Sequence, residues 1–262
     1  MTIFKNELKF SRTALLIWSL SIGLLIAACV FMYPSMKSEM DDVNKLFSSM
    51  GSFSAAFGMD KLNFGTLIGF YAVEGGSILG IGGAFFAAVT AINALMIEER
   101  NRTAEFLMTH PVSRARVITE KLLVVSTQIT ILNIIALILT IASVFLIGET
   151  MAWKELLLIN LSFYLMQIEI AGICFGISAF ITKAGAGIGI GLAAVMYMLN
   201  ILSNISNDAK ALKYITAFGY TDGSTIINKG GLEMQYLLVG MVFCVIGIVV
   251  AYIKYTKKDL RS

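Results

Sequence analysis

Two carboxylates and one amide stand inside long apolar runs of this sequence. Glu74 lies in YAVEGGSILG, and Gln167 and Glu169 lie in LMQIEIAG. An ionisable side chain in a membrane-spanning helix costs about 3 kcal/mol on insertion scales, so it marks a substrate path, a proton relay or an ion site by default. The three residues are therefore candidates for a translocation path. The alternative is that each is a hydrogen-bonded tie between neighbouring helices.

Hydrolytic and nucleotide chemistry lack their usual residues. His110 is the only histidine, so a two-histidine zinc motif is absent and a serine or cysteine nucleophile would have one candidate base. The phosphate-binding pattern G-x-x-x-x-G-K-[ST] is also absent, because the glycine runs at residues 75–83 and 185–191 contain no lysine. We therefore expect no catalytic residue, no metal site and no ATP hydrolysis by this chain alone.

The composition indicates which elements position these residues. Apolar residues make up 57% of the chain and charged residues 14%, with a mean hydropathy of +0.81. This is typical of an integral membrane protein, in which each helix needs about 20 apolar residues to cross the bilayer. We predict a single all-α transmembrane domain over residues 1–262, without a nucleic-acid partner. Its six spans are residues 13–33, 66–97, 122–147, 156–181, 185–205 and 234–253.

The connecting segments predict the topology. Lys and Arg are more frequent on the side that holds both chain ends, which places the N- and C-termini in the cytoplasm. Residues 1–12 suit a short interfacial helix on membrane lipid, or a frayed basic tail. Residues 34–65 and 206–233 form outer loops, the second with a short helix near residues 208–216. Tight links predict that spans three to five are antiparallel neighbours.

A charged stretch separates the second and third spans. Residues 98–123 read EERNRTAEFLMTHPVSRARVITEKLL and favour a helix that stops at Pro111. Ser113 can then cap a second helix, which runs through Lys121 into the third span. This helix, turn and helix present both signs of charge, which favours a docking surface over a solvated loop.

The same stretch resembles the signature of ATP-binding-cassette (ABC) permeases of the type 2 exporter family. That signature has the form G-T-x-E-x-L-L-x-x-P-[VI]-S-R-x-x-[IV]-x-x-K. The matching residues are Thr103, Glu105, Phe106, Leu107, Pro111, Val112, Ser113, Arg114, Val117 and Lys121. Arg102 departs from the pattern, because it stands where the family commonly has glycine.

The resemblance implies that residues 98–121 form a cytoplasmic coupling helix that docks on a separate ATPase. The docking residues would be Glu98, Glu99, Thr103, Glu105, Phe106, Leu107, Pro111, Val112, Ser113, Arg114, Arg116 and Lys121. It further implies two copies of a cytosolic ABC ATPase, which bind ATP and Mg, and a second permease chain, identical or similar. The chain itself would bind no cofactor.

The resulting expectation is a multi-pass permease in a bacterial cell membrane that exports a lipophilic or amphipathic substrate, such as an antimicrobial peptide or a drug. One alternative is an ion-coupled secondary transporter that uses Glu74 and Glu169. Another is a membrane scaffold or sensor that transports nothing.

Overall fold

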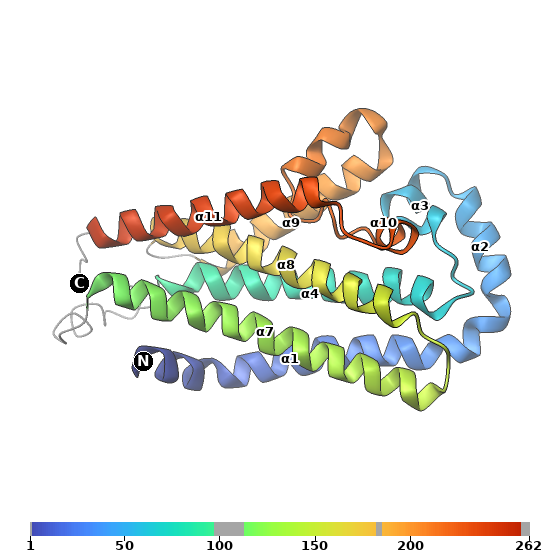
Figure 1. Cartoon of the computed structure of the whole chain (residues 1–262), viewed down its shortest axis with the longest axis horizontal. Helices are drawn as coiled ribbons and strands as arrows, with labels where there is room; N and C mark the ends of the chain where they lie inside the picture. Colours follow the sequence, from blue (N-terminus) through green and yellow to red (C-terminus); the bar gives the residue numbers. More distant parts are fainter. Residues whose placement is uncertain (1, 97–112, 182–184, 258–262) are drawn as a thin grey trace.

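The computed structural model describes residues 2–96, 113–181 and 185–257, and it is helical with no strand in these ranges. Six long helices are apolar enough to cross a membrane (Figure 1). Their bounds are α1 Thr2–Met36, α4 Leu67–Ala94, α7 Arg114–Ile147, α8 Trp153–Ser178, α9 Ala186–Ile205 and α11 Met234–Lys257. Each of the six predicted spans therefore corresponds to one helix.

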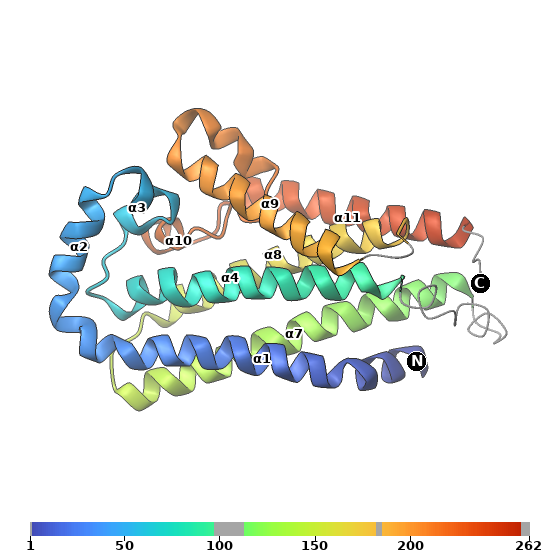
Figure 2. The same cartoon turned by 180° about the vertical axis from the view of Figure 1, so that it is seen from behind.

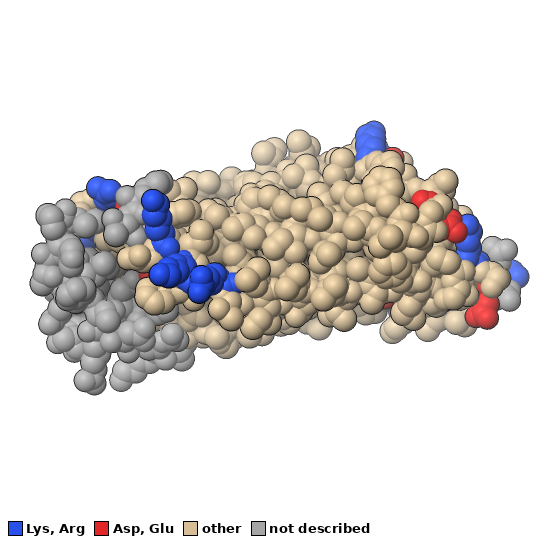
Figure 3. Space-filling view, turned by 90° about the horizontal axis from the view of Figure 1, so that it is seen from below, with Lys and Arg blue, Asp and Glu red and all other residues tan. Residues whose placement is uncertain are grey.

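The six helices run along one axis and give the molecule two distinct ends. The helix α1 begins and α11 ends at the same end, which we call the terminal end (Figures 1 and 2). The opposite, distal end carries the short helices α2 Met40–Ser49, α3 Ser52–Ala56, η3 Asn207–Tyr214 and α10 Gly223–Lys229. On the face in Figure 3, charged side chains lie toward both ends and a broad band without them lies between. This is the distribution that a bilayer requires.

The helices α4 and α8 form the centre of the bundle. They pack against each other along their lengths, α1 packs against α7, and α11 packs against α8. Buried side chains from these helices form one continuous core, which includes Leu79, Ile129, Met166 and Phe175. The central position of α8 explains why most of its inward residues are fully buried.

The prediction that α8 and α9 are close neighbours was wrong. The helix α9 packs against α4 instead of α8, although only a short link joins α8 to α9. Gly189 explains the contact, because a Cβ atom at this position would lie 2.9 Å from the backbone oxygen of Ala88 in α4. The absence of a side chain thus lets the two backbones approach closely.

The first twelve residues also differ from the predicted separate interfacial helix. Residues 2–12 are the first turns of α1, which continues to Met36 without a break. The amide nitrogen of Phe4 donates to Glu120 of α7 at 3.0 Å, and Glu7 pairs with Lys121 at 3.0 Å. These contacts hold the segment along the bundle, because the Phe4 amide and the Glu7 carboxylate have partners on α7.

The distal end contains a segment that turns back into the bundle. After η3, residues 216–221 are buried, although they lie in the region predicted as an outer loop. Asp222 then caps α10 by accepting a hydrogen bond from the Ser224 amide at 3.0 Å. Thr216 is held by donating to the backbone oxygen of Met196 in α9 at 2.7 Å. We call residues 216–221 the re-entrant segment.

Candidate functional site

The N-terminus of α7 lies at the terminal end of the molecule and carries several of the predicted docking residues. The Ser113 hydroxyl accepts a hydrogen bond from the Arg116 amide at 3.3 Å and so caps the helix, as the sequence predicts. Arg116 then pairs through its side chain with Glu120 at 3.0 Å. Because Glu120 also accepts from the Phe4 amide, the first turns of α7 are joined to the start of α1.

Lys121 joins three helices one residue further along α7. Its ammonium group donates to Glu7 of α1 at 3.0 Å and to the backbone oxygen of Ala94, the last residue of α4, at 2.7 Å. The side chain is 1% exposed, whereas that of Glu7 is 30% exposed. Lys121 thus differs from the exposed docking residue that we expected, because it faces the bundle. We call Lys121, Glu7 and Ala94 the three-helix clamp.

The other predicted docking residues divide into two groups. Ser113 and Arg116 are exposed at the terminal end, and Arg114 is half-buried, with its guanidinium donating to the Thr256 oxygen of α11 at 3.3 Å. The remaining candidates lie outside the described residues. They are Glu98, Glu99, Thr103, Glu105, Phe106, Leu107, Pro111 and Val112.

Gln167 is a polar tie within the helix core. Its side-chain oxygen accepts from Asn133 of α7 at 2.6 Å, and its amide donates to the Leu79 oxygen of α4 at 3.4 Å. Gly83 makes room for this amide, because a Cβ atom there would overlap it. Gln167 is fully buried and connects α8 to both neighbours, so its contacts are those of a structural residue.

Glu169 faces a different part of the molecule. One of its carboxylate oxygens accepts a hydrogen bond from the Tyr220 hydroxyl, whereas the other has no partner in the described part of the chain. Gly240 of α11 faces this carboxylate, and a Cβ atom there would overlap it. Glu169 therefore holds the re-entrant segment against α8 and α11. Sequence reasoning missed Tyr220, because no local pattern marks a hydroxyl that returns to the core from a loop.

The three predicted path residues do not come together. Residues two apart on a helix point about 200° apart, and accordingly Gln167 faces α4 and α7 whereas Glu169 faces Tyr220 and α11. Glu74 lies half-buried on α4, and no described residue forms a hydrogen bond or ion pair with it. No common path is formed by these three side chains.

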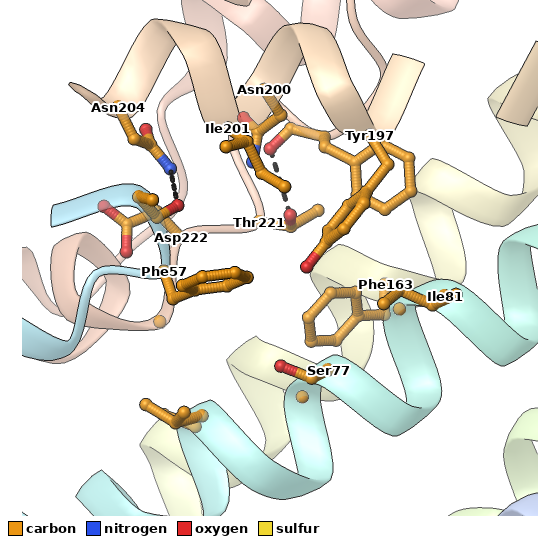
Figure 4. A pocket seen from close by; sticks show the side chains of 17 residues that line it. Phe57, Ser77, Ile81, Phe163, Tyr197, Asn200, Ile201, Asn204, Thr221 and Asp222 are labelled. Carbon is orange, nitrogen blue, oxygen red and sulfur yellow. Dashed lines mark hydrogen bonds between the residues drawn. The ribbon is translucent and has the colours of Figure 1, made fainter. Parts of the chain in front are cut away.

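A cavity lies instead between α4, α9 and the distal-end segments (Figure 4). It encloses about 70 Å³, and we call it the α4–α9 cavity. Its polar lining includes Ser77, Tyr197, Asn200, Asn204, Thr221 and Asp222, and its apolar lining includes Phe57, Ile81, Phe163, Ile201 and Phe218. None of the predicted path residues lines it. The mixture of aromatic and small polar groups suits an amphipathic molecule more than a strongly hydrophilic one.

One family model matches nearly the whole chain. It is that of the ABC-2 family transporter protein, and the match covers residues 1–260. No curated protein matches the chain. The match includes the signature stretch, all six long helices and the distal-end segments, so it concerns the full architecture.

Proposed function

Because the chain belongs to the ABC-2 transporter family, we propose that it is the membrane permease subunit of an exporter driven by a separate ATPase. The terminal end would face the cytoplasm of a bacterial cell, and the ATPase would dock there and bind ATP and Mg. The chain contributes the membrane path and no nucleotide chemistry, since it lacks a phosphate-binding loop.

The three-helix clamp is the observation that best supports this coupling. The helices α4 and α7 flank residues 98–112 in the sequence, and Lys121 ties both to α1. A force applied between α4 and α7 would therefore move three of the six spans together. Rigid-body motion of this kind is how a transporter converts a cytoplasmic event into access on the other side.

We propose further that two permease chains and two ATPases form the working complex. The helices α9 and α11 have many exposed apolar side chains, including Val195, Met198, Leu238 and Val242. Such faces in a membrane contact lipid or another copy of the protein. The second chain can be identical or similar.

We propose a lipophilic or amphipathic cargo. The α4–α9 cavity, at about 70 Å³, has room for only a small part of such a molecule, and its mixed lining suits a part with both polar and apolar groups. An antimicrobial peptide or a drug belongs to this class. The direction of transport is outward in the proposal, in keeping with the exporter signature.

Charge reversal tests the docking proposal. The triple variant Glu105→Lys, Arg114→Glu, Arg116→Glu should no longer copurify with the cognate ATPase and should lose transport while still inserting in the membrane. A matched control, Glu39→Lys with Lys154→Glu, reverses exposed charges at the distal end and should leave both intact. Normal copurification and transport by the triple variant would contradict the proposal.

Glu169 favours one second candidate, an ion-coupled transporter, because it is buried and one of its oxygens has no partner among the described residues. In that case transport would continue without ATP and stop when the proton gradient is removed. The exporter proposal predicts the opposite pair of results in proteoliposomes.

A further inference from the structure

A second cavity lies at the distal end and is lined mainly by polar groups. It encloses about 260 Å³. Its basic residues are Lys61 from the short helix η2 Met59–Lys61, together with Lys210 and Lys213 from η3. Ser203, Asn204, Asp222, Thr225, Glu233 and Tyr236 also line it. We call it the lysine cavity.

The acidic residues of this cavity already have partners. Asp222 accepts hydrogen bonds from the amide and hydroxyl of Ser224 at 3.0 and 2.8 Å and from the Thr225 hydroxyl at 2.8 Å. Glu233 pairs with Lys229 at 2.8 Å, and this hydrogen bond raises the pKa of Lys229. Glu233 therefore has a cationic partner, whereas the partners of Asp222 are neutral and leave its negative charge in the cavity.

The three lysines outnumber the two carboxylates, Asp222 and Glu233, that line the same cavity. Within the described ranges, no acidic side chain lies at ion-pair distance from Lys61, Lys210 or Lys213. Three lysines in the lining of one concave surface leave it with more positive than negative side chains, and this raises the local concentration of anions. Their donors suit the oxygens of a phosphate or carboxylate group. The lining therefore favours an oxyanion over a cation.

The lysine cavity adjoins the α4–α9 cavity. Asn204 and Asp222 line both, and in Figure 4 they lie on one side of the cavity, with Phe163 and Ile81 on the other. Asn204 is held in place by donating to the Ala56 oxygen at 3.3 Å. The basic surface and the aromatic and aliphatic side chains between α4 and α9 are therefore adjacent, with Asn204 and Asp222 at their shared border.

We propose that the two cavities together bind an anionic amphiphile at the distal end. Its phosphate or carboxylate group binds Lys61, Lys210 and Lys213, and the carbon atoms next to that group enter the α4–α9 cavity beside Ser77 and Phe163. The inference adds to the proposed function, because it assigns the cargo a negative charge. It rests on that function, since the bound ligand is the cargo only if the chain is an exporter.

Isothermal titration of the whole chain in phosphatidylcholine nanodiscs tests the site, with empty nanodiscs as the blank. The probes are hexyl phosphate, inorganic phosphate and hexanol. Hexyl phosphate should bind more tightly than either of the others, because only it has both parts. Its affinity should fall with added salt, since the lysines are near the surface.

Two variants separate the two parts of the site. The triple variant Lys61→Gln, Lys210→Gln, Lys213→Gln should weaken hexyl phosphate binding about tenfold or more, whereas Lys154→Gln, an exposed distal-end lysine outside the cavity, should not. Ser77→Phe fills the α4–α9 cavity and should reduce the affinity for hexyl phosphate to that for inorganic phosphate.

Three results would overturn the proposal. They are unchanged binding by the triple variant, equal binding of hexanol and hexyl phosphate, and equal binding of inorganic phosphate and hexyl phosphate. No ATPase is present in this assay. Failure here therefore leaves ATPase docking standing, and a failed copurification with the ATPase leaves the binding site standing.

Discussion

The hydroxyl of Tyr220 donates a 2.9 Å hydrogen bond to the carboxylate of Glu169, across 51 residues of sequence. Both side chains are buried, and the bond joins the re-entrant segment to the centre of α8. It is the one hydrogen bond that the carboxylate forms among the described residues. The buried acid thus depends on one residue from the distal end.

Tyr220→Phe should therefore destabilise the protein by about 1–3 kcal/mol, because it leaves a buried acceptor without its donor. Thermal unfolding in one fixed detergent measures this. Tyr214→Phe is the matched control and should change little, since Tyr214 is 43% exposed. Equal melting temperatures for Tyr220→Phe and the parent chain would show that the bond contributes nothing.

Glu169→Gln should keep the fold, because the amide oxygen can still accept from Tyr220. Under the exporter proposal it should also retain most ATP-driven transport in proteoliposomes, since no step requires Glu169 to titrate. Loss of transport with unchanged thermal stability would instead favour the ion-coupled alternative.

Lys121→Met should separate ATP hydrolysis from transport. It removes the contacts to Glu7 and Ala94, and breaking a buried pair costs about 3 kcal/mol, less where one partner is partly solvated, as Glu7 is. The ATPase should still copurify and hydrolyse ATP, whereas transport per ATP should fall several-fold. Lys9→Met, at an exposed position on α1, is the control. Unchanged transport per ATP in Lys121→Met would exclude a coupling role for the clamp.

Gly240→Ala should destabilise the bundle by about 1–3 kcal/mol, because the added methyl group overlaps the carboxylate of Glu169. Gly191→Ala in α9 adds the same methyl group where nothing lies within 4 Å. That control should be neutral or stabilising by up to about 1 kcal/mol, the helix propensity difference. The melting temperature of Gly240→Ala should consequently fall while that of Gly191→Ala stays the same or rises. An unchanged or raised melting temperature for Gly240→Ala would mean that the space around Gly240 is not limiting.

Ser113→Ala should loosen the first turn of α7, since loss of a capping side chain costs about 1 kcal/mol. Hydrogen exchange should increase in residues 114–118 and stay unchanged in the distal half of α7. Thr66→Ala removes the corresponding cap of α4, where the Thr66 hydroxyl accepts from the Gly69 amide, and should affect only that helix. Uniform exchange along α7 in Ser113→Ala would argue against a local cap effect.

Features encoded locally could be predicted from the sequence. The six spans follow from apolar runs, and the Ser113 cap follows from a serine two residues after Pro111, where the sequence predicts that a helix stops. The opposite directions of Gln167 and Glu169 also follow from helical periodicity, so a single path lined by both could have been excluded beforehand.

Long-range contacts could not be predicted in the same way. Lys121 is a basic residue in the charged stretch and is therefore predicted to dock on the partner. Only the positions of Glu7 and Ala94 show that its side chain points into the helix bundle. Link length wrongly placed α9 beside α8, because a short loop limits distance but does not choose between neighbouring partners. The choice of α4 depends on the close approach at Gly189, which requires both helices to be placed.

The helix α7 is unbroken over 34 residues and contains neither proline nor glycine. It is thus about 50 Å long, some 20 Å more than the hydrocarbon thickness of a bilayer, and it lacks the usual sites of kinking. Such a rod behaves as a stiff lever. A tilt of about 5° about its midpoint would carry each tip roughly 2 Å sideways, so displacement can reach the far leaflet without any hydrogen bond along the rod being broken.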